Sequence, residues 1–417
     1  MRRMTRQMTR IRMGALAATL TAVLAVAVPT AATAATTATA ATAAAAAAAA
    51  VPLVCPGTPA PAVTTATPDV PLDDMFVNYA DHGAGDDHWT GADGTYSAAL
   101  PGDRDLWIFS DTFLGHVNPD GSRSPTVSDG GTTPFINNSF VEETGHAGVS
   151  LKTIHGGSAS DPKALMPPPD STHWYWAGDA IVADGTLQAV YQEYASFGSS
   201  PFDFGFERNV LARFHLGDLS HPFDVRQLPS SAGIAWGSWI ARDRGFTYIY
   251  GVEDLGANKY MHVARVPGDD LLGAWQYYTS AGTWSPDESA SARIAEPAAS
   301  DGTLRVANEY SVTRVGNVYV LVTQNILQAF SPEIDVLFSC SPAGPFTDRT
   351  AIYDAPEHSL YASLGDPNVY AYNAHAHSDV SAPGHLVISY NVNSLVNTDL
   401  YHDAAIYRAR FIDLKLG

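Results

Sequence analysis

A fivefold repeat of short strand-like segments is the feature that most constrains this chain. Each copy is rich in β-branched and aromatic residues, as β-strands are, and each ends in an acid or an amide. Repeats of this kind are typical of folds assembled from similar units. The copies are Leu106–Asp111, Leu187–Glu193, Phe246–Glu253, Val318–Gln324 and Leu386–Asn391.

A glycine turn precedes every copy, another strand-like stretch precedes the turn, and a third stretch follows the copy. The turns are Pro101-Gly102, Asp184-Gly185, Arg244-Gly245, Gly316-Asn317 and Pro383-Gly384. The first stretches are Gly94–Leu100, Trp176–Ala183, Trp236–Arg242, Glu309–Val315 and Tyr370–His377, and the third are Asn138–Glu143, Asn209–Leu216, Tyr260–Val266, Ile334–Cys340 and Ala404–Ile412. This order is the plan of a propeller blade, so the sequence predicts an all-β, single-domain, five-bladed β-propeller. A β-sandwich with long loops is the alternative, but it does not explain the fivefold pattern.

The N-terminal segment predicts export from a bacterial cell. Residues 1–13 carry five arginines and no acid, an apolar stretch follows, and Ala32-Thr33-Ala34 forms a small-x-small cleavage pattern. We therefore expect a signal peptide at residues 1–34 and a secreted, extracellular protein. Residues 35–71 are almost all Ala, Thr, Pro and Val, which is typical of a flexible linker, so the folded domain is expected to span residues 72–417.

Charge and cysteine content limit the partners. Loss of the five N-terminal arginines would take the formal charge from −20 to −25, and such a surface repels nucleic acid. No later stretch is apolar enough for membrane insertion, and nothing in the sequence indicates an oligomeric state. Two cysteines in an exported chain predict one disulfide, and we expect Cys55 and Cys340 to pin the N-terminal segment across the ring.

Two carboxylates in the first repeat are the best candidates for catalysis. Asp93 lies about nine residues before the Pro101-Gly102 turn and Asp111 about nine residues after it. An antiparallel hairpin would therefore place both at one rim on adjacent strands, about 5 Å apart. Paired carboxylates at that spacing are what glycoside hydrolysis requires. Alternatively, each Asp only stabilises a turn.

Other polar and aromatic residues are expected near the same rim as substrate-binding groups. They are Asp179, Glu309 and His375, together with Trp176 and Trp239, whose ring faces suit the apolar faces of sugars. Glu193 and Glu253 end second strands and are reserve candidates for catalysis. Each of these residues taken alone is more typical of a hydrogen-bonded or core position.

The sequence predicts no cofactor. The Asp81–His88 segment is dense in Asp and His, and His375 and His377 form a second pair, so Ca²⁺ or a transition metal stays open as an alternative. The spacings match no metal motif, and Asp and His next to glycine are most often loop residues.

Two motifs resemble a known family. Gly91–Ser97 followed by Leu106–Gly115, and Ile388–Ser394 with Tyr407–Ile412 near the C-terminus, are similar to the opening and closing parts of a bacterial secreted five-bladed propeller family that was long called a domain of unknown function. Some of its members are endo-D-arabinanases. The resemblance implies a glycoside hydrolase of polysaccharides, with Asp93 and Asp111 in catalysis.

Three classes of function remain at this stage. The first is an endo-acting glycosidase, in which Asp93 acts as base or nucleophile and Asp111 as proton donor, or with these roles reversed. The second is a non-catalytic propeller that binds carbohydrate. The third is a structural or protein-binding propeller at the cell surface.

Overall fold

The computed structural model describes residues 53–56, 58–145, 150–198 and 203–417. The expected signal peptide and residues 35–52 of the expected linker lie outside this part. Within it, no helix combines the length and the apolar composition needed to cross a membrane.

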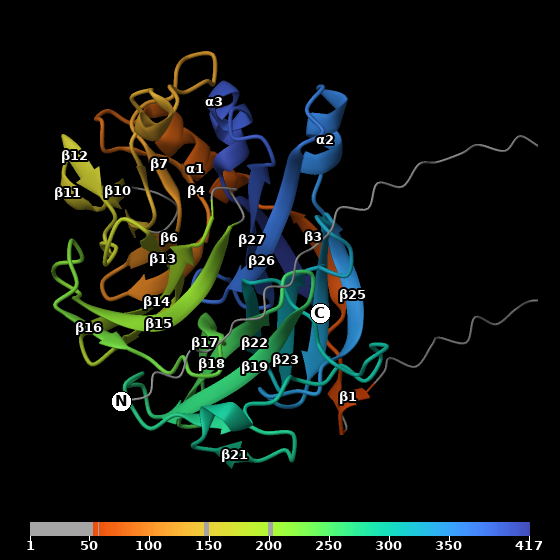
Figure 1. The fold of residues 1–417 in the computed structure, drawn as a ribbon. Coiled ribbons are helices and arrows are strands. Elements are labelled where there is room, and N and C mark those ends of the chain that lie inside the picture. Colours follow the sequence, from red (N-terminus) through yellow and green to blue (C-terminus); the bar gives the residue numbers. More distant parts are fainter. Residues whose placement is uncertain (1–52, 57, 146–149, 199–202) are drawn as a thin grey trace, which may run out of the picture. The chain divides into compact units, whose positions relative to one another are not determined.

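Five antiparallel sheets of four or five strands contain most of the strand residues of the described part of the chain (Figure 1). From the innermost strand outward, the first sheet contains β5 (Tyr96–Leu100), β6 (Arg104–Phe109), β9 (Ser139–Thr144) and β10 (Ser150–Ile154), and the second contains β13 (His173–Ala183), β14 (Thr186–Ser196), β15 (Phe204–His215) and β16 (Asp224–Gln227). The third contains β17 (Ala235–Asp243), β18 (Phe246–Asp254), β19 (Lys259–Pro267), β20 (Gln276–Tyr278) and β21 (Trp284–Ser285). The fourth contains β22 (Tyr310–Val315), β23 (Val318–Gln324), β24 (Glu333–Ser339) and β25 (Thr347–Asp354), and the fifth contains β26 (Val369–His377), β27 (His385–Ser394), β28 (Arg410–Leu416) and β3 (Val63–Pro68).

Short elements connect and flank these sheets. The small sheets pair β1 (Leu53–Cys55) with β2 (Thr58–Pro59), β4 (Trp89–Ala92) with β7 (Thr112–Leu114) and β8 (Phe135–Ile136), and β11 (Gly156–Ser158) with β12 (Asp161–Lys163). The helices are α1 (Val70–His82), α2 (Glu357–Ser363), α3 (Asp399–His402) and the 3-10 turns η1 (Val127–Asp129), η2 (Glu288–Ala290) and η3 (Ala404–Tyr407).

The predicted repeat is confirmed as the first hairpin of each sheet. The glycine turns allow tight reversals because their backbones enter the left-handed region, for example φ +48° at Asp184 and +75° at Gly185, as hairpin turns matched to strand twist require. The first strands of successive sheets contact one another, from β5 to β13, β17, β22 and β26. The His375 ring on β26 then contacts the Thr95 carbonyl oxygen at 2.7 Å, which completes the circuit. The fold is a five-bladed propeller.

Hydrophobic clusters between successive blades hold the ring together. Tyr191 and Phe140 pack between the first two blades, Trp236 between the next two, and Tyr310 and Phe346 between the third and fourth. Another cluster joins the last two blades. A fifth joins the last blade to the first, and Phe76 of α1 contributes to it. The inner hairpins are therefore rigid supports for residues at their ends.

The expected linker at residues 35–71 is corrected for its C-terminal part, which closes the ring. Strand β3 pairs with β28, with Ile412 opposite Pro68 and Leu414 opposite Ala66. In Figure 1 the orange β3 lies among the blue elements of the C-terminal part of the chain. Val63 and Ala66 pack against the core of the last two blades. Low-complexity composition concealed this strand because one edge strand needs only a few small apolar side chains.

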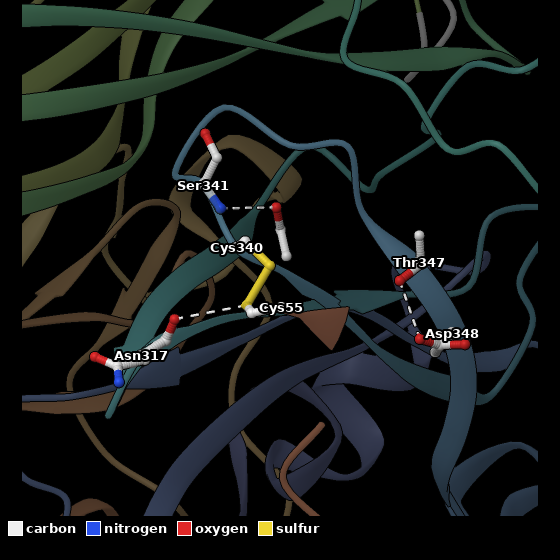
Figure 2. The surroundings of a disulfide bond; sticks show 7 residues. Cys55, Asn317, Cys340, Ser341, Thr347 and Asp348 are labelled. Carbon is white, nitrogen blue, oxygen red and sulfur yellow. Dashed lines mark hydrogen bonds between the residues drawn. A yellow bond between two sulfur atoms is a disulfide. The ribbon is translucent and has the colours of Figure 1, made fainter. Parts of the chain in front are cut away.

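The disulfide between Cys55 and Cys340 is present, and its placement corrects the expectation that it would cross the ring. Cys340 directly follows β24, so the bond ties the N-terminal segment to the fourth blade, beside the fifth blade that β3 completes. Figure 2 shows the two sulfur atoms near Asn317, whose carbonyl oxygen lies 3.8 Å from Cys55 Sγ. The expected strand at 404–412 is also corrected: Asp403 caps η3 through the Ala405 amide, and β28 begins at Arg410.

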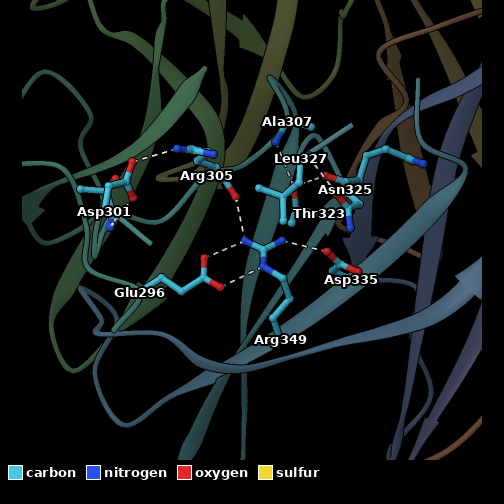
Figure 3. Close-up of polar contacts among 11 residues, drawn as sticks. Glu296, Asp301, Arg305, Ala307, Thr323, Asn325, Leu327, Asp335 and Arg349 are labelled. Carbon is cyan, nitrogen blue, oxygen red and sulfur yellow. Dashed lines mark hydrogen bonds and ion pairs between the residues drawn. The ribbon is translucent and has the colours of Figure 1, made fainter. Parts of the chain in front are cut away.

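A partly buried arginine fixes the long connection between the third and fourth blades. Arg349 on β25 donates to both Glu296 oxygens, at 2.9 and 2.8 Å, and to Asp335 at 2.8 Å (Figure 3). It also donates to the Arg305 carbonyl oxygen at 3.0 Å. Such bidentate pairs fix geometry as well as contributing energy, so the segment that leads to Glu309 is held in place.

We expect replacement of Cys55 by Ser to lower the free energy of unfolding by up to about 5 kcal/mol, because the bond closes a long loop in the unfolded chain. The bond joins residues 285 positions apart. Denaturant titration of Cys55→Ser, Cys340→Ser and the double variant measures the change. The three variants should be equally destabilised, and mass spectrometry of the unreduced parent that finds two free thiols would contradict the prediction.

Candidate active site

The first hairpin is interrupted at the two predicted acids. Its outer part pairs β4 with β7 and its inner part pairs β5 with β6, and the break lies between them. Across this break the Asp93 amide donates to the Asp111 carbonyl oxygen at 3.2 Å, and the Ser110 amide donates to the Asp93 carbonyl oxygen at 2.8 Å. The two acids are therefore neighbours on adjacent strands, at the level that the residue count predicts.

Glycine is required inside this break. Gly94 has φ +61°, and a Cβ atom there would lie 2.5 Å from Ser110 Oγ. An L-residue would thus be strained in its backbone and would also collide with the opposite strand. Irregular pairing of this kind redirects side chains next to functional sites, and here it accompanies the turn of both carboxylates into one cavity.

This cavity measures about 500 Å³ and lies at the ends of the inner strands that are remote from the glycine turns. Its lining includes Asp93 and Asp111 from the first blade and Glu309 from the segment just before β22. Three carboxylic acids from two non-adjacent blades therefore meet in one pocket. Two buried oxygens, Asp93 Oδ1 and Glu309 Oε2, have no hydrogen-bond partner among the described residues.

Asp93 is buried and accepts a hydrogen bond that favours its charged form. Burial raises its pKa above the ordinary value, but the Tyr372 hydroxyl donates a hydrogen bond of 2.7 Å to Oδ2 and favours the charged form. The charge on Asp93 in turn raises the pKa values of Asp111 and Glu309. Ionisation of Asp93 therefore opposes ionisation of the other two acids.

Asp111 keeps its proton to near neutrality. Burial and then the charge on Asp93 raise its pKa to about 7. Two donors limit the rise, because Asn137 Nδ2 and Trp176 Nε1 each lie 2.9 Å from Oδ1. Glu309 differs, since burial followed by the charge on Asp93 raises its pKa well above the ordinary value, and Asn373 Nδ2 at 3.0 Å only partly opposes this.

Two aromatic walls border the acids. On one side Trp176 packs against Tyr194 at 4.6 Å and Phe204 at 5.1 Å between ring centroids. On the other side Tyr372 packs against Tyr370 at 5.4 Å, and Tyr370 against Phe330 at 4.6 Å. All six side chains line the cavity. The arrangement offers flat apolar faces next to carboxylic acids, which suits a sugar ring.

Comparison with known proteins places the chain in a family. Residues 77–415 match the model of DUF5005, a domain of unknown function. The chain belongs to this family. None of the curated proteins matches this DUF5005 chain. The structure of a candidate hydrolase from Bacteroides ovatus matches it with a TM-score of 0.69 at 21% identity, covering 84% of this chain and 90% of that one, which shows a shared fold.

More distant solved structures match with lower scores. A GH43_1 enzyme from Xanthomonas citri complexed with xylose has a TM-score of 0.45 at 14% identity and covers 83% of this chain and 93% of that one. The catalytic domain of a GH62 α-L-arabinofuranosidase from Coprinopsis cinerea has a TM-score of 0.43 at 13% identity, with 78% and 90% covered.

Asp179 and Trp239 are not at this site, which corrects their expected placement. They line a second cavity of about 370 Å³ together with residues next to the glycine turns, at the opposite ends of the inner strands. Asp179 lies midway along β13, and its two oxygens accept from the Ala180 and Ile240 amides at 2.8 and 2.6 Å. Trp239 Nε1 donates to the Val312 carbonyl oxygen at 2.9 Å. Both residues join neighbouring blades.

His375 and the reserve acids also have structural partners. The His375 ring is fully buried, and burial lowers its pKa to about 4, so it is neutral behind Glu309. Glu193 accepts from the Tyr175 hydroxyl at 2.8 Å, and Glu253 pairs with Arg293 at 2.6 Å. Trp176 and Glu309, in contrast, are brought to the cavity with Asp93 and Asp111.

The Asp- and His-rich segment at 81–88 is divided among separate partners. Asp81 pairs with Arg408, Asp86 with His116 and Asp87 with His155, while the His88 ring contacts the Tyr79 carbonyl oxygen. In the part of the chain that the structure describes, no three His, Cys, Asp or Glu side chains group together to hold a metal ion.

Sequence reasoning missed the second aromatic wall. Tyr370 and Tyr372 alternate along β26, which marks one face of a strand, so that signal was available. Phe330 lies in a connection between β23 and β24, and no periodicity could place it.

We expect Asp179→Asn to destabilise the protein by about 1–3 kcal/mol, because an amide cannot accept from both backbone N–H groups and leaves one donor unpaired. Denaturant unfolding measures this loss, and Asp184→Asn at an exposed hairpin turn should be neutral. Because Asp179 lies outside the acidic cavity, activity per folded molecule should be retained. A stable but inactive Asp179→Asn protein would contradict this assignment.

Proposed function

We propose that this DUF5005 protein is a glycoside hydrolase that cleaves a neutral polysaccharide outside the cell. The observation that carries the proposal is the pair of buried acids held on adjacent strands in one aromatic-lined cavity. Asp93 accepts a hydrogen bond that favours its charged form, and the pKa of Asp111 is raised to about 7. One ionised and one protonated carboxyl on adjacent strands are the two groups that glycosidic cleavage uses.

The proposed reaction assigns one step to each acid. Asp111 donates its proton to the glycosidic oxygen as the bond to the leaving sugar breaks, and Asp93 attacks the anomeric carbon. Water then releases the sugar from Asp93, and Asp111 takes the proton from that water. Opposed side chains on adjacent strands have Cβ atoms about 5 Å apart, and a carboxyl separation of similar size is the one used in double displacement with retained configuration.

Glu309 supports the reaction from the opposite side of the cavity. Burial raises its pKa well above the ordinary value, which favours the neutral form, and Oε2 has no hydrogen-bond partner among the residues described. A neutral carboxyl there can donate a hydrogen bond to a sugar hydroxyl without repelling the charge on Asp93. We assign Glu309 to substrate binding.

The cavity favours an uncharged substrate. It is lined by three acids, and its lysine, Lys259, already forms an ion pair with Asp254. An anionic sugar would meet the charge on Asp93 in a poorly solvated site, at a large electrostatic cost. The resemblance of Gly91–Ser97 and Leu106–Gly115 to a family with endo-D-arabinanases further suggests arabinan as the substrate.

We expect Asp93→Asn and Asp111→Asn each to lower kcat by about a hundredfold or more, since each removes a group that acts in the transition state. Glu309→Gln should mainly raise KM. The assay is oligosaccharide release from D-arabinan, L-arabinan, xylan and galactan, with melting curves to confirm folding. Azide should partly restore Asp93→Gly as a substitute nucleophile, because this truncation leaves room for the anion.

The same panel of polysaccharides separates this assignment from a different proton donor and from a non-catalytic propeller. Loss of activity in Glu309→Gln combined with a fully active Asp111→Asn would make Glu309 the proton donor and contradict our assignment. Retention of the protein by a polysaccharide in native gels without any cleavage would indicate a carbohydrate-binding propeller.

The alkaline limb of the pH–rate profile should report Asp111. The donor must be protonated, so kcat/KM should fall as pH rises through about 7, the pKa of Asp111. Trp176→Phe removes a hydrogen bond that stabilises the ionised form, which raises this pKa and should move the limb to higher pH by roughly one unit. Asn137→Ala should move it in the same direction.

Trp174→Phe is the matched control. Trp174 lies on the same strand, and its buried Nε1 has no hydrogen-bond partner within the described residues. Its replacement should leave the alkaline limb in place. Equal shifts in Trp174→Phe and Trp176→Phe would show that Asp111 does not set this limb.

A further inference from the structure

Each aromatic wall ends in a hydrogen bond to one acid of the pair. Trp176 Nε1 donates to Asp111, and the Tyr372 hydroxyl donates to Asp93. The walls therefore extend from the acid pair in two directions. From Tyr372 the second wall continues through Tyr370 to Phe330, with centroid separations of 5.4 and 4.6 Å. Phe330 is its outermost member, and half of its surface is exposed to solvent.

The backbone of Phe330 adopts a conformation that is unusual for a bulky residue. Its φ is +54°, in the left-handed region that bulky residues seldom adopt and that glycine adopts freely. Stability alone would favour glycine at this position. A strained residue that lines a cavity points to a role for its side chain, and here that side chain is an exposed ring facing the entrance to the acids.

The connection that carries Phe330 is held by its own hydrogen bonds. Gln324 Nε2 donates to the Ser331 carbonyl oxygen at 2.8 Å, and the Asn325 amide donates to that of Glu333 at 2.9 Å. Asn325 Oδ1 accepts from the Leu327 amide at 2.9 Å, as Figure 3 shows. The ring is therefore presented at a fixed place, as a binding platform requires.

We propose that Phe330, supported by Tyr370, forms a distal sugar-binding subsite that stacks on a residue of the polysaccharide at least one unit away from the cleaved bond. This inference rests on the proposed hydrolase function and specifies its mode of action. Trp176 with Tyr194 and Phe204 serves the sugar units on the other side of the acids. A chain held on both walls places an internal linkage at Asp93 and Asp111, so the enzyme acts within long chains.

The test compares a long with a short substrate. Phe330→Gly should raise KM for arabinan roughly tenfold, the loss expected for one aromatic stacking contact. It should lower kcat/KM for 4-nitrophenyl arabinofuranoside much less, because this substrate reaches only the acids. Its melting temperature should not fall, because glycine fits the backbone. Phe330→Tyr should restore the KM of the parent.

Leu327→Ala is the control for the loop. Leu327 is equally exposed, at 53% against 50% for Phe330, but it does not line the cavity. Its replacement should change neither KM for arabinan nor kcat/KM for 4-nitrophenyl arabinofuranoside. Unchanged KM for arabinan in Phe330→Gly overturns the proposal, as does an equal loss on both substrates together with a lower melting temperature.

Binding measurements keep the two proposals distinguishable. If the parent cleaves no polysaccharide of the panel, the hydrolase proposal fails, and mobility in arabinan-containing native gels then tests the platform alone. Retardation of the parent but not of Phe330→Gly supports the subsite. Equal mobility of both proteins overturns it.

Discussion

The close approach of the five inner strands is the constraint on which the rest of the structure depends. A Cβ atom on Gly178 would lie 2.6 Å from the Gly237 carbonyl oxygen, and one on Gly237 would meet Val190 at 2.5 Å. Residues along these strands must therefore be small or must satisfy their polar groups within the protein. Ser97, His375 and His377 do so through one another and through backbone oxygens. A cavity lined by the paired acids lies at the strand ends remote from the turns.

Burial alone does not distinguish the acids that bind backbone amides from the acids that line the cavity. Asp179, Asp93 and Glu309 are all buried, and burial raises the pKa of each. The difference is in their hydrogen bonds. Asp179 has both oxygens occupied by backbone amides, whereas Asp93 and Glu309 each keep one oxygen without a hydrogen-bond partner among the described residues. An unpaired buried oxygen is costly, so its retention in a cavity indicates a ligand.

The sequence predicted the features that depend on local periodicity and on the number of residues between nearby positions. Five hairpins, their turns and the matched level of Asp93 and Asp111 all follow from alternation and residue number within one unit. Asp179 was misplaced because β13 begins at His173, three residues before the expected start, so a residue expected near the rim lies midway along the strand. Phe330 and β3 depend on contacts with distant parts of the chain, and no local pattern in the sequence encodes these contacts.

The strand that completes the last blade has a consequence for how the chain acquires its structure. β3 is made early in synthesis, but its partner β28 lies at the far end of the sequence. Until β28 emerges, β3 lacks its pairing and the ring stays open. Contacts so distant in sequence slow folding, and unpaired strand edges meanwhile favour association between chains. Growing chains of this protein should therefore be most prone to aggregate just before β28 is made, and should depend on chaperones until then.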